Sequence, residues 1–495
     1  MSEDLAIKTA TEPPAPRAER RAPKRYIGWR LLAPVVLVLA AFLMVQDLEP
    51  EAVGGIALGM MLVLTFMKVP IGIAMALPSV IGVWSIVGWM PTQGMLSRMP
   101  YDSVASWSLS VIPAFVFMGF LLWRSGVTER LYDVARHWIG WLPGGLAVGT
   151  NFAGAGLAAI TGSSFATAYT LGRAGVPEML KAGYDRRLAV GSVLAAGTLA
   201  HLIPPSIFMV IYAGIAEVPI GPQLMAGVGP GLLLAGVYAV AIVAISIVLV
   251  RKGIAGRGQV AKVTWSERML GLVTIWPVPL LILLVVGSIF TGIFTATEAG
   301  AAGALGALAI TAWARRKERP LSLIGQAAVS TVSTVGALFL LLIGAHMLTR
   351  LVSVSGLGDA FVQIVVGMDL SQTAFLIALA VAFLIMGIFM DALAMMLFSV
   401  PILLPVLQAL EISEVWFGVF MVIFCELAVI TPPVGVLAFT VAQIVQDKAV
   451  NLGNKISLTD VFTAAAYVVV TALVVVGLLV AFPDIALWLP NMMEQ

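Results

Sequence analysis

Two short polar stretches, each followed at the same distance by a Pro-Pro pair, interrupt long apolar runs in this sequence. The first stretch is Thr161-Gly162-Ser163-Ser164, and the second is centred on Asp391. The pairs Pro204-Pro205 and Pro432-Pro433 begin 41 residues after Ser163 and after Asp391. Proline has no N–H and interrupts the hydrogen-bond ladder of a helix, which leaves carbonyl oxygens free. Free carbonyls, hydroxyls and a carboxylate suit a hard cation such as sodium, while helix N-termini suit an anionic group.

The elements that carry these residues are predicted to be membrane helices. Of the 495 residues, 60% are hydrophobic and 11% are charged, which excludes an ordinary soluble enzyme. The single cysteine, Cys425, excludes a disulfide framework and a Cys-based metal site. No G-x-x-x-x-G-K-[ST] nucleotide loop occurs, so the sequence does not indicate nucleotide binding or a nucleotide-driven activity. Apolar runs of about 20 residues predict spans at 27–46, 52–68, 70–89, 111–124, 188–214, 224–250, 270–290, 297–313, 325–348, 416–440 and 461–488.

Two further apolar stretches are predicted to be re-entrant hairpins, because Lys and Arg stay on the cytoplasmic side of a membrane. Basic residues flank both ends of 142–172, so this hairpin would enter from the cytoplasm. Acidic residues flank 373–405, so this hairpin would enter from the outside. Of the 28 Lys and Arg residues, all but Arg98 and Arg350 then lie inside. The N-terminus is predicted to be cytoplasmic and the C-terminus to lie outside.

A weak repeat with an offset of 228 residues relates the two halves of the chain. TLAHLIPPSIFMVIY (198–212) aligns with ELAVITPPVGVLAFT (426–440), and the same offset places Ser163 on Asp391. The predicted topology inverts one half relative to the other. A single proline or Ser/Thr cluster is commonly a kink or a helix contact, but interrupted helices in paired inverted repeats are typical of secondary transporters. The predicted fold is an all-α polytopic membrane protein with two re-entrant hairpins and two Pro-Pro broken helices.

Several of these stretches resemble the large membrane (M) subunit of TRAP (tripartite ATP-independent periplasmic) transporters. The matching segments are LPGGLAVGTNFAGAGLAAITGSSFATAYTLG (142–172), VPEMLKAGYD (176–185), GTLAHLIPPSIFMVIY (197–212), IFTATEAGAAGALGAL (293–308), MGIFMDALAMMLFSVPILLPV (386–406) and ITPPVG (430–435). Over roughly residues 55–490 the order and spacing fit. The resemblance implies an elevator-type, sodium-coupled importer of small organic acids in the bacterial inner membrane, with the C-terminus in the periplasm. It implies two partners, a small four-helix membrane subunit and a periplasmic substrate-binding protein, and neither enzyme activity, an organic cofactor nor a nucleic-acid partner.

The resemblance also implies a division into scaffold and transport elements. The expected segments are a disordered cytoplasmic tail (1–26), an extra membrane helix (27–46), scaffold helices and an arm (47–110), repeat 1 with its hairpin and broken helix (111–214), further scaffold helices (215–324), repeat 2 (325–440) and a C-terminal membrane helix (441–495).

The resemblance implies two sodium sites and a substrate site between the hairpin tips. The residues expected to bind sodium are Thr161, Ser164, Ala200, Ile203 and Pro205 at the first site, and Gly387, Asp391, Ala428, Thr431 and Val434 at the second. Those expected to bind substrate are Ser163, Ser164, Pro205, Ser206, Asp391, Pro433 and Gly435. Asp391 has two interpretations, because an intramembrane carboxylate is usually functional but can also cap the following helix.

Three other features have a structural and a functional interpretation. His201 lies where the family usually has a small or apolar residue; it is either a packed, hydrogen-bonded side chain or a substrate or gating residue. Glu426 either pairs with a neighbour or tunes a sodium site. The connectors at 91–110 and 349–370 are expected along the outer interface, where Arg98 and Arg350 would be positioned to dock the binding protein.

The sequence also offers three alternatives to this importer. A stand-alone ion-coupled anion transporter would need no binding protein. An intramembrane enzyme would need a catalytic constellation, for which Ser163 or Ser164 with His201 is the candidate. Hairpins that enter from opposite sides favour alternating access over a passive channel.

Overall fold

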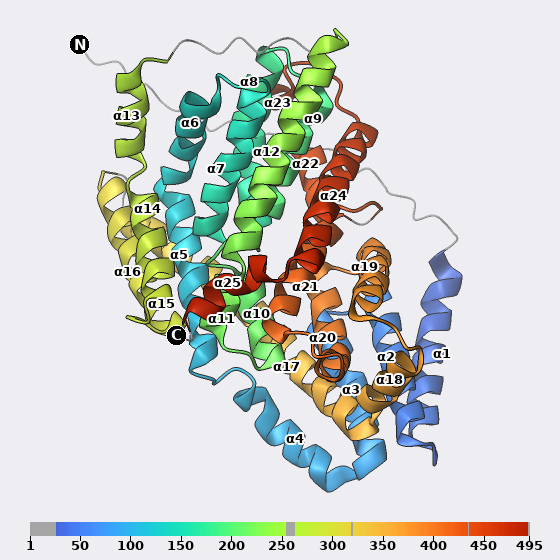
Figure 1. The fold of residues 1–495 in the computed structure, drawn as a ribbon. Coiled ribbons are helices and arrows are strands. Elements are labelled where there is room, and N and C mark those ends of the chain that lie inside the picture. Colours follow the sequence, from blue (N-terminus) through green and yellow to red (C-terminus); the bar gives the residue numbers. More distant parts are fainter. Residues whose placement is uncertain (1–25, 254–262, 318–319, 434, 494–495) are drawn as a thin grey trace, which may run out of the picture.

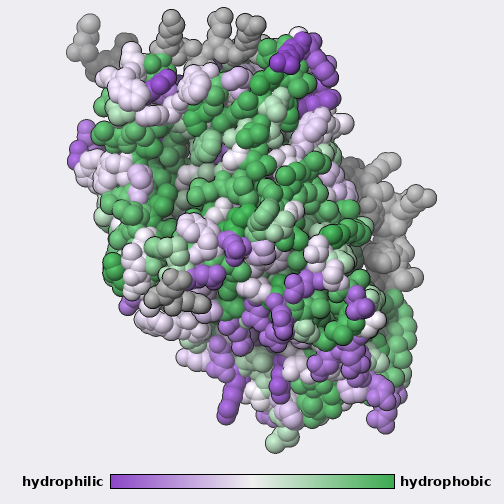
Figure 2. Space-filling model, in the orientation of Figure 1, coloured by the Kyte–Doolittle hydropathy of each residue, from purple (hydrophilic) through white to green (hydrophobic). Residues whose placement is uncertain are grey.

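The computed structural model describes residues 26–253, 263–317, 320–433 and 435–493, and within them the chain is helical, with no β-strand. Within these ranges, six helices are long and apolar enough to cross a membrane, or seven if the bent pair Trp265–Thr274 and Pro277–Phe290 is one span. Figure 1 shows a group of long helices running side by side while others cross them obliquely, and Figure 2 shows hydrophobic residues over much of the visible face. The predicted all-α, multi-pass fold is confirmed.

Two helical hairpins occupy the predicted positions. In the first, α7 (Gly145–Thr161) is followed by α8 (Ser164–Lys181); in the second, α19 (Gln372–Phe389) is followed by α20 (Ala392–Ala409). Gly162 ends α7 with a left-handed φ of 54°, and Ser163 caps α8 by accepting a hydrogen bond from the Ala166 N–H. The second tip turns without glycine, since Met390 is extended and Asp391 caps α20.

Both Pro-Pro helices are broken, as predicted. The first consists of α9 (Arg186–Thr198) and α10 (Ile207–Ala216), and the second of α21 (Glu414–Ala428) and α22 (Val436–Ile444). Pro204–Pro205 and Pro432–Pro433 are both cis. Each hairpin packs against the broken helix of its own half and also crosses to the other half, because α8 contacts α22 and α20 contacts α10. The two halves therefore meet around the tips and breaks.

The remaining helices surround these four elements (Figure 1). Before the first hairpin come α1 (Tyr26–Met44), α2 (Pro50–Phe66), α3 (Ile71–Val87), α4 (Trp89–Asp102), η1 (Ser108–Ser110), α5 (Val111–Ser125) and α6 (Val127–Ile139). Between the halves come α11 (Ile220–Ala226), α12 (Val228–Arg251), α13 (Trp265–Thr274), α14 (Pro277–Ile282), η2 (Leu283–Gly287), α15 (Ser288–Phe290), α16 (Ala296–Ala314), α17 (Pro320–Ser355) and α18 (Leu357–Gly367). The chain continues with α23 (Lys448–Asn451), α24 (Leu458–Ala481) and α25 (Asp484–Met493).

Three predicted spans differ from the structure by more than a few residues or by an unexpected break. The span predicted at 325–348 is the 36-residue helix α17, which continues to Ser355 because it meets no breaker before Gly356, whose φ is 70°. The span predicted at 461–488 is two helices, because Pro483 cannot continue α24 and α25 begins after it. The span predicted at 270–290 bends by 45° between Thr274 and Pro277. The tail predicted at 1–26 lies outside the described residues, apart from Tyr26.

Candidate functional site

The first hairpin tip lies against the first broken helix. A Cβ built on Gly162 would lie 3.3 Å from the Pro205 carbonyl oxygen, so the tip backbone closely approaches the Pro-Pro break. Thr161 is buried, and its hydroxyl donates to the Leu157 carbonyl (2.9 Å) and accepts from the Ser163 N–H (3.4 Å). The structure therefore brings three of the predicted residues, Thr161, Ser163 and Pro205, to one place.

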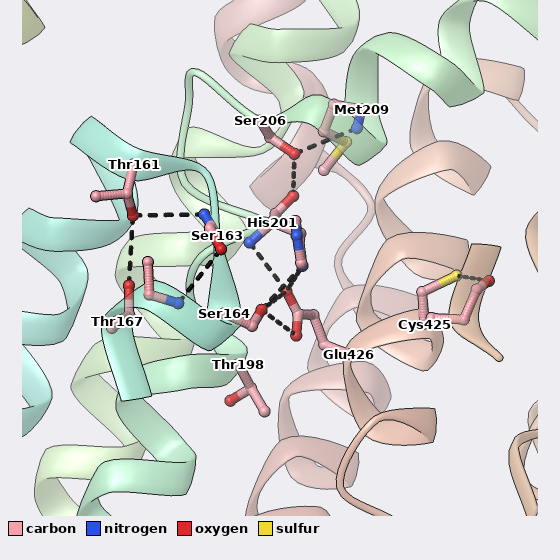
Figure 3. A network of polar contacts seen from close by, with 12 residues as sticks. Thr161, Ser163, Ser164, Thr167, Thr198, His201, Ser206, Met209, Cys425 and Glu426 are labelled. Carbon is pink, nitrogen blue, oxygen red and sulfur yellow. Dashed lines mark hydrogen bonds and ion pairs between the residues drawn. The ribbon is translucent and has the colours of Figure 1, made fainter. Parts of the chain in front are cut away.

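Ser164 turns away from the tip and enters a buried polar network (Figure 3). Its hydroxyl lies 3.0 Å from His201 Nδ1 and 3.2 Å from each carboxylate oxygen of Glu426. The Glu426 Oε1 atom also lies 2.5 Å from His201 Nδ1 and accepts from the His201 N–H at 2.9 Å. Glu426 is only 2% exposed, so hydrogen bonds from protein groups take the place of the water that would otherwise solvate its carboxylate. The network joins the first tip and first break to the second broken helix.

These three side chains do not form a hydrolytic triad. In such a triad the serine hydroxyl bonds to one imidazole nitrogen and the acid bonds to the other, so that the ring can take the serine proton. Here Ser164 and Glu426 both approach Nδ1. The serine lies directly against the carboxylate, and the geometry gives no support to an intramembrane enzyme.

Carbonyl groups at the first break lose their helical donors because of the prolines. Pro204 and Pro205 have no N–H, so the carbonyls of Ala200 and His201, four residues earlier, receive no helical hydrogen bond. The Ser206 hydroxyl donates to the His201 carbonyl and accepts from the Met209 N–H, so Ser206 also caps α10. The Ala200 carbonyl has no hydrogen-bond donor among the described residues. This carbonyl is therefore available to a cation.

The second tip and break have the same backbone plan with different side chains. Asp391 is exposed and accepts from the Leu393 N–H (3.1 Å), so its capping interpretation is confirmed. Behind the tip, the Cys425 thiol donates to the Ala392 carbonyl (3.3 Å). A Cβ built on Gly387 would lie 2.9 Å from Ala428 Cβ, so these two predicted residues are adjacent. No three His, Cys, Asp or Glu side chains of the described chain are grouped to hold a metal, so a cation would depend on backbone and hydroxyl oxygens.

The other predicted residues have mixed positions. Ile203 is half-buried in the first break, while Ser206 is buried there. Thr431 donates to the Leu427 carbonyl (2.7 Å), Gly435 is buried and Pro433 is exposed. Val434 lies outside the described residues.

A cavity of about 660 Å³ opens beside the first tip. Of the seven residues predicted for substrate, Ser163 lines it, and the other six do not: Ser164, Pro205, Ser206, Asp391, Pro433 and Gly435. Thr161 and His201 also line it. One wall is a stripe on α5, formed by Val116, Gly119, Phe120 and Trp123 at helical spacing. Leu393 of the second hairpin also lines it, so both halves contribute.

Sequence reasoning missed two features of this site. The sequence gives separate interpretations for His201 and for Glu426, and no local pattern indicates that these residues, 225 positions apart, bond to each other. Their placement on the two aligned Pro-Pro motifs was the available signal. The α5 stripe was missed because an apolar helix face also fits ordinary core packing.

Comparisons with known proteins agree with this architecture. The family described as Tripartite ATP-independent periplasmic transporter, DctM component, matches residues 58–485. The chain is 28% identical over 433 residues to the ectoine TRAP transporter large permease protein TeaC of Halomonas elongata, covering 87% of this chain and 97% of that protein. It is 31% identical over 346 residues to the C4-dicarboxylate TRAP transporter large permease protein DctM of Pseudomonas aeruginosa, covering 70% and 79%.

Two further proteins extend the comparison. The sialic acid TRAP transporter permease protein SiaT of Haemophilus influenzae is 26% identical over 441 residues, covering 88% of this chain and 68% of that protein. The crystal structure of the YdaH transporter of Alcanivorax borkumensis superposes with a TM-score of 0.61 at 14% identity, covering 81% of this chain and 90% of that one. At this identity the structural likeness shows the fold alone.

Proposed function

The chain belongs to the DctM component family of tripartite ATP-independent periplasmic transporters, and we propose that it is the large membrane subunit of a sodium-driven importer of organic acids. The matching family and relatives are transporters, which confirms that the chain is not an enzyme. Two of the relatives are named for C4-dicarboxylates and sialic acid, and both are carboxylates. This supports an organic acid as the substrate class.

The observation that carries the proposal is the pair of hairpin tips, each held against a Pro-Pro break in an inverted repeat. Gly162 closely approaches Pro205 at the first pair, and Gly387 contacts Ala428 at the second. Such breaks leave carbonyl oxygens inside a membrane protein, where they can replace the water around a cation.

Sodium binding at the two pairs is part of the proposal. At the first, the Thr161 and Ser164 hydroxyls and the carbonyls of Ala200, Ile203 and Pro205 would supply the oxygens. At the second, we propose Gly387, Asp391, Ala428, Thr431 and Val434. Substrate would bind between the tips, with Ser163, Ser164, Pro205, Ser206, Asp391, Pro433 and Gly435 as the proposed contacts.

An elevator movement would carry both sites across the membrane. We propose that the two hairpins and two broken helices move as one transport domain against a scaffold that includes α5 and α17. Their contact is close, because a Cβ built on Gly119 of α5 would lie 2.8 Å from the Thr161 carbonyl oxygen. A small four-helix membrane subunit and a periplasmic binding protein would complete the complex in the bacterial inner membrane, with the N-terminus cytoplasmic and the C-terminus periplasmic.

Reconstitution tests this function. The chain, its small subunit and the binding protein are placed in liposomes with an imposed inward sodium gradient, and uptake of labelled organic acids is measured. We expect uptake that needs both the gradient and the binding protein. Equal uptake without the binding protein would favour the stand-alone transporter, and uptake indifferent to sodium would overturn the proposed coupling.

A further inference from the structure

The cavity beside the first tip has an aromatic lining. Phe120 and Trp123 come from α5, Phe165 and Tyr169 from α8, and Phe208 from the start of α10. Aromatic side chains bury large apolar areas and favour stacked or edge-on contact with another ring. Phe165 and Tyr169 are 41% and 43% exposed, so these rings present open faces that the chain's own core does not cover. The lining therefore suits a ligand with a flat, apolar part such as an aromatic ring.

Charge is confined to the rim of this cavity. None of the described residues that line it is Lys, Arg, Asp or Glu. The Arg124 guanidinium lies over the Trp123 ring at 5.8 Å, and the Arg173 guanidinium lies over the Tyr169 ring at 5.6 Å. Because cations already lie against these two rings, an aromatic cage for a second cation is disfavoured. The cavity suits an uncharged or anionic ligand.

The polar side chains that line the cavity are Thr161, Ser163, Tyr169, His201, Thr334 and Thr440, and several already have partners. The Thr161 and Thr440 hydroxyls donate to the Leu157 and Val436 carbonyls, and His201 Nδ1 lies against the Glu426 carboxylate. The Ser163 hydroxyl accepts from the Ala166 N–H and keeps its own proton to donate. Arg173, the nearest basic side chain to Tyr169, already donates to the Tyr169 hydroxyl and to Asp447, each at 2.8 Å. The lining holds no Lys or Arg, and its one imidazole, His201, already lies against Glu426, so a second carboxylate would lose its hydration without gaining a cationic partner.

We propose that this cavity takes an organic acid with one carboxylate and a flat apolar body, such as an aromatic ring, in preference to a small dicarboxylate. This proposal rests on the proposed function, because it names the substrate class of that importer. A volume of about 660 Å³ is within the usual range of small-molecule sites. The ring would contact Phe120, Trp123 and Phe165, and the carboxylate would lie toward Ser163.

Thiol protection tests the proposal without any transport measurement. The single native cysteine, Cys425, is fully buried, so a maleimide reports on a cysteine placed in the cavity. Thr334→Cys on α17 supplies that reporter, and Thr440→Cys on α22 is a second reporter at another part of the lining. Labelling rates are measured for the full chain in nanodiscs with phenylacetate or with succinate. We expect phenylacetate to slow labelling at a concentration at least tenfold below that of succinate.

Matched variants assign the effect to the cavity. Phe165→Ala in the reporter background should raise the half-protecting phenylacetate concentration at least tenfold. Phe152→Ala is its control, because Phe152 has the same exposure of 41% but does not line the cavity. Equal or better protection by succinate, no protection by phenylacetate at either reporter, or equal effects of the two Phe variants would each overturn the proposal. Failure of sodium-driven uptake in liposomes would instead overturn the proposed function, so the two failures are distinguishable.

Discussion

Each hairpin tip and the Pro-Pro break beside it form a tip–break pair. The first and second tip–break pairs have the same backbone arrangement but differ in the side chains that stabilise it. In both, a capping side chain starts the second arm of the hairpin, Ser163 in one and Asp391 in the other. Behind the first tip lies the buried network of Ser164, His201 and Glu426. Behind the second lies a thiol contact from Cys425 to the Ala392 carbonyl. One pair is thus held by a buried network of side-chain hydrogen bonds, and the other mainly by close packing.

The two halves of the repeat keep the contact between hairpin tip and broken helix, although different residues make it. Gly197 and Cys425 are equivalent positions at the 228-residue offset, and both lie against the first carbonyl of a hairpin arm. A Cβ built on Gly197 would lie 3.5 Å from the Ser164 carbonyl oxygen, and Cys425 Sγ lies 3.3 Å from that of Ala392. The contact between tip and helix is kept while its chemistry changes. The repeat therefore specifies the positions of backbone groups, and single substitutions have made the pairs unequal.

Removing the Glu426 carboxylate should have the largest effect. Glu426→Ala leaves the His201 backbone N–H without its acceptor in a buried site and reduces the partners of the Ser164 hydroxyl to His201 Nδ1. Breaking such a network costs about 3–5 kcal/mol of unfolding free energy, and we expect uptake to fall to background. Denaturant unfolding in detergent and liposome uptake measure the two effects.

The matching change in the second pair is Cys425→Ala. It removes one weak thiol hydrogen bond and a little apolar volume, so we expect a loss of about 1 kcal/mol. Because Cys425 and Glu426 are neighbours on α21, the variants test the same helix. Equal losses for both would contradict the view that the two pairs are held differently.

The second largest effect should come from glycines at the tight contacts. Gly119→Ala places a methyl group 2.8 Å from the Thr161 carbonyl oxygen, and Gly387→Ala places one 2.9 Å from Ala428 Cβ. The second methyl group would also lie 3.0 Å from Ala428 Cα, so neither variant faces a flexible side-chain end, and both should impair uptake by about tenfold. Gly55→Ala is the control, since its methyl group would meet nothing within 4 Å. An unchanged rate in Gly119→Ala would count against a close contact between α5 and the first tip during transport.

Much of the fold around the two tip–break pairs could be predicted from the sequence. Apolar length located the helices, the basic flanks of 142–172 identified a hairpin, and the Pro-Pro motifs located both breaks. These signals are local, because a proline disrupts its own turn and a Lys or Arg cannot readily cross a bilayer. The expectation that the first tip lies beside the first break came instead from the family resemblance, and the structure brings Gly162 close to Pro205.

Other parts of the site depend on the way the halves pack. The Ser164 hydroxyl points toward the Glu426 carboxylate on α21, and no sequence pattern near the tip indicates this contact. The α5 stripe at Phe120 and Trp123 becomes a cavity wall because neighbouring helices leave space beside it. Helix ends were also affected by single residues, such as Pro483, which ends α24 before the predicted boundary.

A moderate effect is expected when the charge at the second tip is removed. Asp391→Asn keeps a capping side chain, because asparagine caps helices as well as aspartate does. We expect the half-saturating sodium concentration for uptake to rise about fivefold, roughly 1 kcal/mol, through loss of a charged ligand. Asp185→Asn is the control, since Asp185 caps α9 by accepting from the Arg187 N–H. If the half-saturating sodium concentration were identical in wild type and Asp391→Asn, Asp391 would not be a ligand of the second sodium site.

The smallest effect is expected at two hydroxyls that the halves hold in the same way. Thr161 donates to the Leu157 carbonyl at 2.9 Å, and Thr431 donates to the Leu427 carbonyl at 2.7 Å, each four residues earlier. In both cases the hydroxyl proton is taken, so the oxygen lone pairs remain for a cation. Thr431→Val keeps the shape and removes one neutral ligand, and we expect the half-saturating sodium concentration to rise about twofold, roughly 0.4 kcal/mol.

Thr161→Val should have a larger effect than Thr431→Val, because Thr161 also accepts from the Ser163 N–H at the tip. Thr463→Val controls for the loss of a hydroxyl bonded in the same way, since Thr463 donates to the Thr459 carbonyl on α24, away from both tips. Sodium titrations of uptake rank the three variants. If Thr431→Val exceeded Thr161→Val, the cation would depend more on the second pair, and the polar network of the first would serve to position the tip instead of binding the ion.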